Sequence, residues 1–137
     1  MKYACLGYYD EKAILALPQP EQDRLVQDCF DYDDHLKQAG HFADGLALQP
    51  ATTAMTVRRA RGRAVVTDGP YAETKEILGG ILVLEATDLN HAVQIMSKHP
   101  GLAFGFFEIR PLDEVITGRA KTTVRPERSE AKSKGPQ

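Results

Sequence analysis

The sequence has 137 residues, of which 42% are hydrophobic and 26% charged, and its formal net charge is -2. This length predicts one domain with a real core, although such a chain buries only about two-thirds of its unfolded surface. The charge gives no basis for electrostatic capture of nucleic acid or of an anionic membrane, so we expect neither partner. The two cysteines lie in apolar patterns, which predicts reduced core thiols in a cytoplasmic protein rather than a disulfide framework.

The N-terminal third predicts one strand and one long helix. Residues 2–9 are apolar at nearly every position, as in a central strand covered on both faces. This run ends at Asp10 and is too short to predict a signal peptide or a membrane helix. Residues 11–17 fit either a short helix or a packed loop. From Pro20 to Gly40 apolar residues recur at helical spacing, with Pro20 suited to the first helical position and Gly40 to a left-handed cap.

Strand patterns dominate the rest of the chain. Residues 46–49 predict a short strand, and residues 54–59 and 63–67 predict a β-hairpin that turns at Arg61-Gly62. A strand, a helix and a final strand follow at residues 81–87, residues 89–99 after a cap at Thr87 or Asp88, and residues 104–110.

Without the hairpin, this order predicts an α+β fold: a ferredoxin-like βαββαβ sandwich with an inserted β-hairpin. Both helices would cover one face of the sheet, yet the first strand is apolar on both alternations, at Tyr3 and Cys5 and again at Leu6. A sheet that is apolar on both faces but covered on one needs a partner, so we expect a two-fold homodimer through the sheet face. Almost nothing is apolar after the domain at residues 1–116, which predicts a disordered tail at residues 117–137.

One stretch combines turn chemistry with a high density of polar side chains. Val66 to Glu76 reads Val-Thr-Asp-Gly-Pro-Tyr-Ala-Glu-Thr-Lys-Glu, and Gly79-Gly80 follows. It resembles the signature of the DGPF proteins, the YCII-related family, which reads Asp-Gly-Pro-Phe-x-Glu-x-Lys-Glu and then Gly-Gly; here Tyr71 replaces the usual Phe. The resemblance extends from residue 1 to about residue 112. It implies membership of the dimeric α+β barrel superfamily, in which two such sheets pack face to face.

Asp68 ends a predicted strand and begins a tight turn. In a structural interpretation its carboxylate accepts hydrogen bonds from backbone amides two residues on. In a functional one, a carboxylate at a strand end beside the dimer cleft is a general base or a substrate-binding group. Glu73 to Leu78 predicts one helical turn, which would place the carboxylates of Glu73 and Glu76 on one face beside Lys75. These charges suit acid–base work, and they equally suit ion pairs that hold the loop.

Four further residues are candidates for binding or proton transfer. Glu108 and Arg110 share one face of the last strand, either as an ion pair or with Arg110 bound to an anionic group; Arg58 is a second candidate for that role. His35, on the first helix, is a group that titrates near neutrality, and it would either approach Asp68 or face solvent. Related YCII proteins carry a histidine on this helix that is thought to pair with an aspartate near the end of the second helix. That aspartate is missing here.

The other histidines show no ligand spacing, so no metal and no cofactor is predicted. Two functions remain open. The resemblance implies a site with Asp68, His35, Glu73 and Glu76 in catalytic roles and Arg110, Lys75, Tyr71, Arg58 and Glu108 binding substrate. Such a set suits a cofactor-free enzyme of isomerase, dehydratase or dehalogenase type acting on a small polar or aromatic acid. The alternative is a non-catalytic dimeric module, either a small-ligand sensor or an accessory protein. The resemblance implies a link to transcriptional regulation, since DGPF proteins are often found beside extracytoplasmic-function sigma factors.

Overall fold

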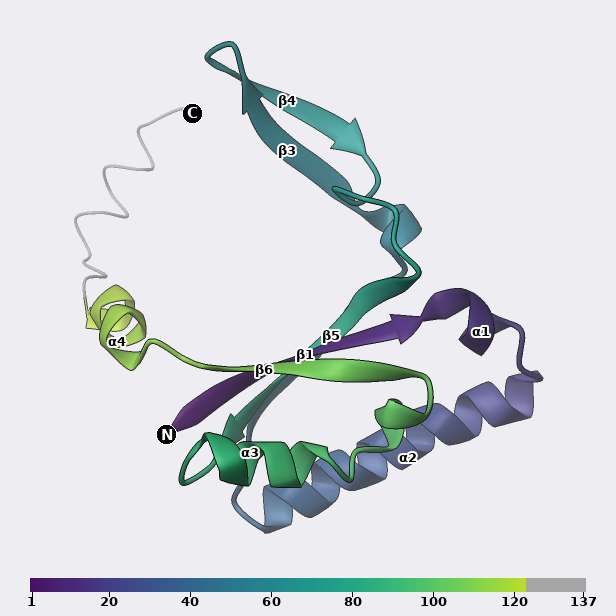
Figure 1. Ribbon diagram of the computed structural model, residues 1–137, viewed down its shortest axis with the longest axis vertical. Helices are drawn as coiled ribbons and strands as arrows, with labels where there is room; N and C mark the ends of the chain where they lie inside the picture. Colours follow the sequence, from purple (N-terminus) through teal and green to yellow (C-terminus); the bar gives the residue numbers. More distant parts are fainter. Residues whose placement is uncertain (123–137) are drawn as a thin grey trace.

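The computed structural model describes residues 1–122 of the chain. Figure 1 shows a sheet with two helices beneath it, a hairpin that rises from the opposite side, and a short helix that stands apart at the end of the described chain. In chain order the elements are β1 (Lys2–Asp10), α1 (Glu11–Leu15), α2 (Gln19–Gln38), β2 (Phe42–Ala47), the 3₁₀ turn η1 (Ala51–Thr53), β3 (Met55–Ala60), β4 (Arg63–Asp68), β5 (Glu76–Glu85), α3 (Leu89–Met96), the 3₁₀ turn η2 (Pro100–Ala103), β6 (Gly105–Pro111) and α4 (Glu114–Thr122).

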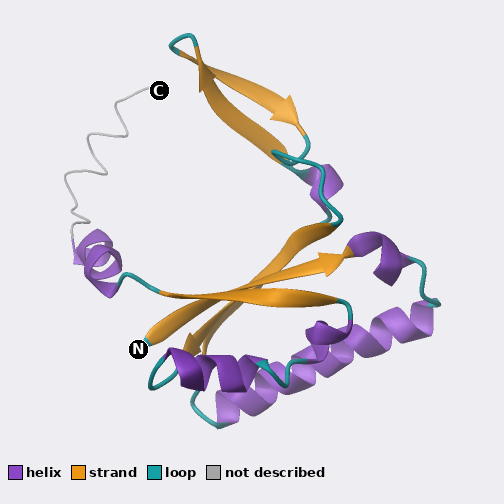
Figure 2. Cartoon of the chain, in the orientation of Figure 1, coloured by secondary structure: helices purple, strands orange, loops and turns teal. Residues whose placement is uncertain are grey.

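The main sheet has four strands in the order β2-β5-β1-β6, and all neighbouring strands are antiparallel. The helices α2 and α3 connect β1 to β2 and β5 to β6, while β3 and β4 form a separate two-stranded sheet (Figure 2). This connectivity confirms the predicted ferredoxin-like βαββαβ fold with an inserted hairpin.

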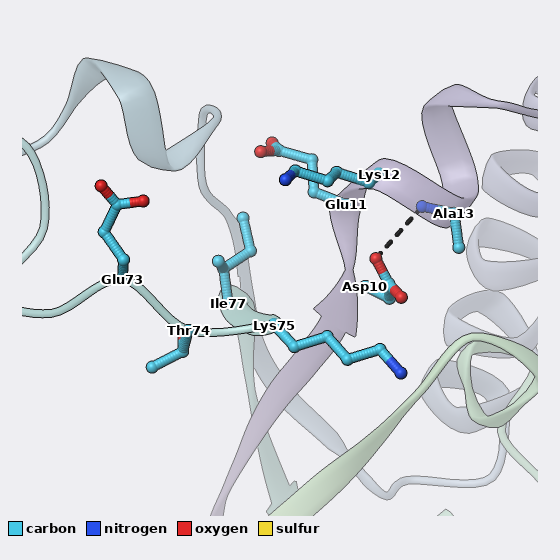
Figure 3. A pocket seen from close by; sticks show the side chains of 8 residues that line it. All are labelled: Asp10, Glu11, Lys12, Ala13, Glu73, Thr74, Lys75 and Ile77. Carbon is cyan, nitrogen blue, oxygen red and sulfur yellow. Dashed lines mark hydrogen bonds between the residues drawn. The ribbon is translucent and has the colours of Figure 1, made fainter.

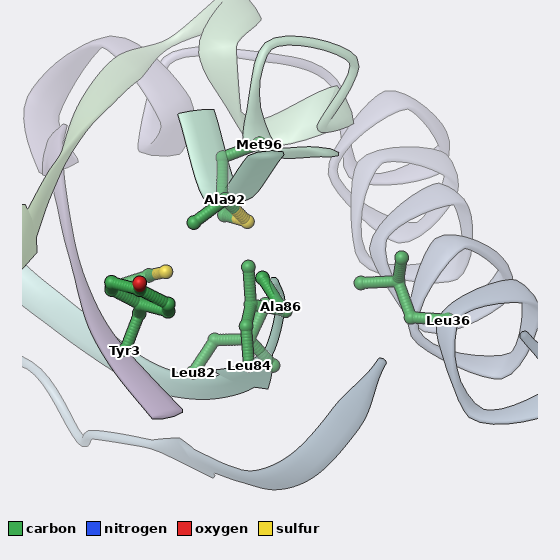
Figure 4. Close-up of a cluster of buried hydrophobic side chains, with 8 residues drawn as sticks. Tyr3, Leu36, Leu82, Leu84, Ala86, Ala92 and Met96 are labelled. Atoms are coloured by element: carbon green, nitrogen blue, oxygen red, sulfur yellow. The ribbon is translucent and has the colours of Figure 1, made fainter. Parts of the chain in front are cut away.

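The core lies between the sheet and its two helices. Tyr3 and Cys5 of β1 alternate with outward residues and are almost completely buried, as is Leu84 of β5. They pack against Leu36 of α2 and Met96 of α3, and Figure 4 shows side chains from sheet and helices converging on one cluster. The side chain of Asp88 accepts a hydrogen bond from a main-chain amide in the first turn of α3, so the predicted cap is confirmed.

The other alternation of β1 forms what we call the open face of the sheet. Ala4, Leu6 and Tyr8 point away from the helices, and their partners across the neighbouring strands share this face: Val83, Ile81 and Phe106. The rings of Tyr8 and Phe106 stack with centroids 5.2 Å apart, and the Phe106 side chain is still 48% exposed. No part of residues 1–122 therefore covers the apolar open face.

The hairpin of β3 and β4, residues 55–68, is here called the arm. It turns at Arg61 and Gly62, with φ values of 53° and 78°, so the predicted turn is confirmed. Its strands pair with each other and with no other strand of residues 1–122. Figure 1 shows the arm on the side of the main sheet that faces away from α2 and α3.

The predicted helical turn from Glu73 to Leu78 is wrong, because Glu76 already begins β5. Gly79 and Gly80 lie inside that strand, where the pairing with β1 shifts by one residue and leaves Gly79 opposite no partner. A Cβ atom on Gly79 would lie 2.0 Å from the ring of Tyr9. The glycine therefore permits a close approach inside the sheet.

Other boundaries also differ from the prediction. The strand expected at residues 46–49 is β2 and starts at Phe42, and the strand expected at residues 81–87 is part of β5. Helix α3 ends at Met96, and residues 100–103 form a separate 3₁₀ turn, since Pro100 cannot continue the α-helical hydrogen bonds.

Helix α4 includes residues 117–122, which the sequence placed in a disordered tail; the rest of that tail, residues 123–137, lies outside the described residues. None of the helices in residues 1–122 combines the length and the apolar run that crossing a membrane requires.

Candidate functional site

The loop between β4 and β5, residues 69–75, is here called the signature loop, and it leaves the arm through a turn held by backbone hydrogen bonds and one threonine. The Gly69 amide donates to the Ala54 carbonyl at 2.7 Å, and the Thr56 hydroxyl donates to the Gly69 carbonyl at 2.8 Å. Gly69 has a φ of 94°, a conformation that favours glycine. Within residues 1–122 no hydrogen bond or ion pair reaches the exposed carboxylate of Asp68, so the predicted bonds to backbone amides are not formed.

Beyond this turn, the loop borders a hollow of about 630 Å³. The hollow lies where the end of β1 and the start of α1 face the segment that enters β5, because Asp10 and Glu76 are paired across the two strands. Figure 3 shows side chains from both segments around the space. The lining residues are Asp10, Glu11, Lys12, Ala13, Glu73, Thr74, Lys75 and Ile77.

The charged side chains of the hollow are of both signs. Asp10 accepts a hydrogen bond from the Ala13 amide at 3.1 Å and so caps α1. The carboxylate of Glu73 and the ammonium groups of Lys12 and Lys75 form no hydrogen bond or ion pair within the described part of the chain. These groups are therefore available to a ligand in the hollow.

Two predicted site residues, Arg58 in the middle of β3 and Tyr71 just beyond the arm, contact each other. Tyr71 is 78% exposed, and its carbonyl accepts a long hydrogen bond of 3.5 Å from Arg58 Nη2. Neither residue lines the hollow.

Glu108 and Arg110 lie on the open face of the sheet, across from Leu6 and Ala4. Arg110 Nε lies 3.3 Å from Glu108 Oε2, with the two side chains 71% and 45% exposed. This is an exposed ion pair, which contributes roughly 0–1 kcal/mol to stability. It lies on the surface that a second copy would cover in the predicted dimer.

His35 is exposed on α2, on the helix side of the sheet, with its ring centroid 6.1 Å from that of Tyr32. Asp68 lies on the arm, on the opposite side of the sheet (Figure 1), so the predicted approach of His35 to Asp68 does not occur within one chain.

His99 is the histidine with a distinctive environment. Its ring lies edge-on to Tyr32 at 5.4 Å and to Phe107 at 4.7 Å, and its Nδ1 accepts a hydrogen bond of 2.9 Å from the Gly101 amide. Burial among these groups lowers the pKa of His99 to about 4. A neutral imidazole in this position caps η2 and fills space between α2 and β6.

Sequence reasoning missed the residues at the end of β1: Asp10, Glu11 and Lys12. Their signal was indirect, since an antiparallel partner of β1 that begins just after the signature must bring Asp10 next to Glu76. The cysteines offer no nucleophile, because burial raises the pKa of Cys5 to about 12 and that of Cys29 to about 11. Among the described residues, no group of three His, Cys, Asp or Glu side chains is arranged to hold a metal ion.

The fold defines the class of protein. The chain has a four-stranded antiparallel sheet, with α2 and α3 on one face and an open apolar face on the other. This is the α+β fold of the dimeric α+β barrels. The chain belongs to the YCII-related domain family, whose profile matches residues 1–116. The chain is 33% identical over 114 residues to an uncharacterized protein of Rhizobium meliloti (strain 1021). The aligned region covers 82% of this chain and 92% of that protein.

A solved structure shares the fold. The chain is similar to the 5-chloro-2-hydroxyhydroquinone dehydrochlorinase TftG from Burkholderia phenoliruptrix AC1100, solved with 2,5-dihydroxybenzoquinone. The TM-score is 0.50 and the identity 11%, with 82% of this chain and 94% of that chain covered. At this identity the similarity concerns the fold.

Proposed function

We propose that this protein is a cofactor-free acid–base enzyme, of isomerase, dehydratase or dehalogenase type, that acts on a small polar or aromatic acid in the hollow beside the signature loop. The observation that carries the proposal is the hollow itself. Glu73, Lys12 and Lys75 all line it, and within residues 1–122 their charged groups form no hydrogen bond or ion pair. Proton transfer next to a developing oxyanion needs this combination of a base and cationic groups.

In the proposed mechanism Glu73 is the general base and takes a proton from a carbon or hydroxyl of the substrate. Lys75 and Lys12 bind the substrate carboxylate and stabilise the negative charge that develops as the proton leaves. Asp10 caps α1 through its hydrogen bond from the Ala13 amide, and this bond holds the side of the hollow that faces Glu73.

The enzyme would be a two-fold homodimer in which the open faces of two sheets pack together. The exposed ring of Phe106 and the apolar residues around it supply the contact that a single chain leaves uncovered. The ion pair of Glu108 and Arg110 would lie at this interface, away from the hollow of the same chain, because Arg110 is paired with Ala4 whereas the hollow begins at Asp10.

The dehydrochlorinase supports the proposal at the level of the fold. Its name describes elimination of chloride from a small hydroxylated ring, and its structure was solved with a dihydroxybenzoquinone. A hollow of about 630 Å³ in this chain is of a size that suits a molecule of that kind.

The second candidate function is a dimeric module that binds a small ligand without turnover. It is favoured by the separation of Asp68, Arg110 and His35, which lie on the arm, the open face and the helix layer of one chain. A sensor needs only the binding groups of the hollow, whereas an enzyme needs a reacting set in one place.

A binding and turnover assay separates these functions. The probes are 2,5-dihydroxybenzoquinone and a panel of small hydroxylated aromatic and aliphatic acids, tested by calorimetry and by spectroscopic turnover. The variant is Glu73→Gln, and the matched control is Glu21→Gln, an exposed carboxylate on α2.

For an enzyme, Glu73→Gln should bind the probe and lose turnover while the control keeps both. Binding without turnover in every protein indicates the sensor, and a wild type that binds none of the probes contradicts a ligand site in the hollow.

A further inference from the structure

The arm leaves apolar side chains without a cover. Alternation along β3 and β4 places Met55, Val57 and Val66 on one of its faces, where they are 59%, 65% and 56% exposed. A two-stranded hairpin is at best marginally stable in water unless another surface packs against it. Within residues 1–122 neither β3 nor β4 pairs with the main sheet.

The position of the arm indicates where that cover comes from. The arm rises on the side of the main sheet opposite α2 and α3, which is the side of the open face (Figure 1). A second copy that packs its sheet on the open face would therefore stand beside the arm. The same partner can satisfy two uncovered apolar surfaces of one chain.

The length of the arm matches the thickness of such a partner. Each of its strands has six residues, which span about 20 Å at roughly 3.3 Å per residue. Two packed sheets are about 10 Å apart, and a helix on the far side adds about 10 Å. An arm that runs along the edge of the second copy thus brings its tip level with that copy's helix layer.

The arm and the helix α2 of the second copy, which the arm tip would reach, carry opposite charges. The arm has four arginines, namely Arg58, Arg59, Arg61 and Arg63, against the single carboxylate of Asp68. Helix α2 lies in the helix layer and has six acidic residues against two basic ones: Glu21, Asp23, Asp28, Asp31, Asp33 and Asp34, against Arg24 and Lys37. Opposite fields of this kind fix the partner and its orientation.

We propose that the arm clasps a second copy of this chain, with Met55, Val57 and Val66 packed on its edge and the arginine tip placed on its acidic α2. The inference rests on the proposed dimer and extends its interface beyond the two open faces. A nucleic acid is the competing partner for an arginine-rich tip. The second copy is favoured because the exposed apolar residues of the arm are aliphatic and offer no ring on which a base could stack.

Charge reversal tests the clasp. One variant carries Arg59→Glu, Arg61→Glu and Arg63→Glu, and leaves Arg58 with its bond to the Tyr71 carbonyl. A second variant reverses three exposed acids of α2 with Asp28→Lys, Asp31→Lys and Asp34→Lys. A third variant combines both sets, which restores complementarity and also the net charge of the wild type. All six positions are exposed, so circular dichroism should show every variant folded.

The readout is the dimer dissociation constant from sedimentation equilibrium at low and at high salt. Each single set should weaken the low-salt dimer by about tenfold or more, because a two-fold dimer contains the contact twice. The combined variant should regain most of the loss, and high salt should reduce the differences.

Two results overturn the inference in distinguishable ways. A wild-type dimer whose arm variant dimerises equally well rejects the clasp and leaves the proposed dimer standing. A wild type that is monomeric at every concentration rejects the dimer and the clasp together. In a parallel binding assay with a short single-stranded DNA, loss of binding in an arm variant that keeps its dimer constant assigns the tip to nucleic acid instead.

Discussion

Acidification should destabilise this protein through His99. The imidazole is half-buried between Tyr32 and Phe107, where its neutral form is favoured, and its Nδ1 accepts the Gly101 amide. The pKa of His99 falls from its ordinary value of 6.5 to about 4 in the folded state. Between these two pH values His99 is protonated in the unfolded chain but mostly neutral in the folded one. The free energy of unfolding therefore rises with pH and falls on acidification.

The size of the effect follows from the two pKa values. The full difference corresponds to roughly 3 kcal/mol, reached only below pH 4. At pH 5 the unfolded His99 is almost fully protonated and the folded one is mostly neutral, so about 2 kcal/mol of the stability at pH 7 should be lost through this residue.

Urea unfolding at pH 7 and at pH 5 measures this loss, with His99→Asn as the test variant. Asparagine keeps an acceptor for the Gly101 amide and cannot be protonated, although the lost ring contacts should lower stability at both pH values. The wild type should lose about 2 kcal/mol more than His99→Asn between the two pH values. His35→Asn, an exposed position on the same helix layer, is the matched control. Equal losses in wild type and His99→Asn would refute the reasoning.

Four further substitutions test the fold by the same unfolding assay. Gly105→Ala would place a Cβ atom 1.8 Å from the Tyr8 carbonyl oxygen and should cost at least about 3 kcal/mol, whereas Gly118→Ala, with no atom within 4 Å, should be neutral or stabilising by up to about 1 kcal/mol. Leu84→Ala empties a fully buried position and should cost about 2–5 kcal/mol. Asp88→Ala removes the cap of α3 and should cost about 1 kcal/mol. A neutral Gly105→Ala or Leu84→Ala would contradict the described packing.

Features with a local cause could be predicted from the sequence. The hairpin turn depends on Arg61 and Gly62 adopting positive φ, which neighbouring residues signal directly. The cap at Asp88 likewise needs only the residue type and the apolar stripe that follows. The order of these elements was enough to predict the ferredoxin-like topology.

Features that depend on contacts between distant segments were predicted poorly. The segment from Glu73 to Leu78 was predicted as a helical turn, but pairing with Asp10 draws Glu76 into β5 and overrides that local tendency. The same pairing creates the hollow, so Glu11 and Lys12 could be recognised as lining residues only through the register of β1 against β5. His99 was placed at the end of a helix because the 3₁₀ turn beyond it depends on packing against Phe107.

The central claim is that the open face of the sheet is covered by a second copy of the chain. Sedimentation velocity of the wild type beside Phe106→Asp tests it most directly, because Phe106 lies on that face, half-exposed and stacked on Tyr8. The wild type should sediment as a species of two 15.1 kDa chains, and Phe106→Asp as a folded single chain. A wild type that sediments as one 15.1 kDa chain at every concentration would contradict it.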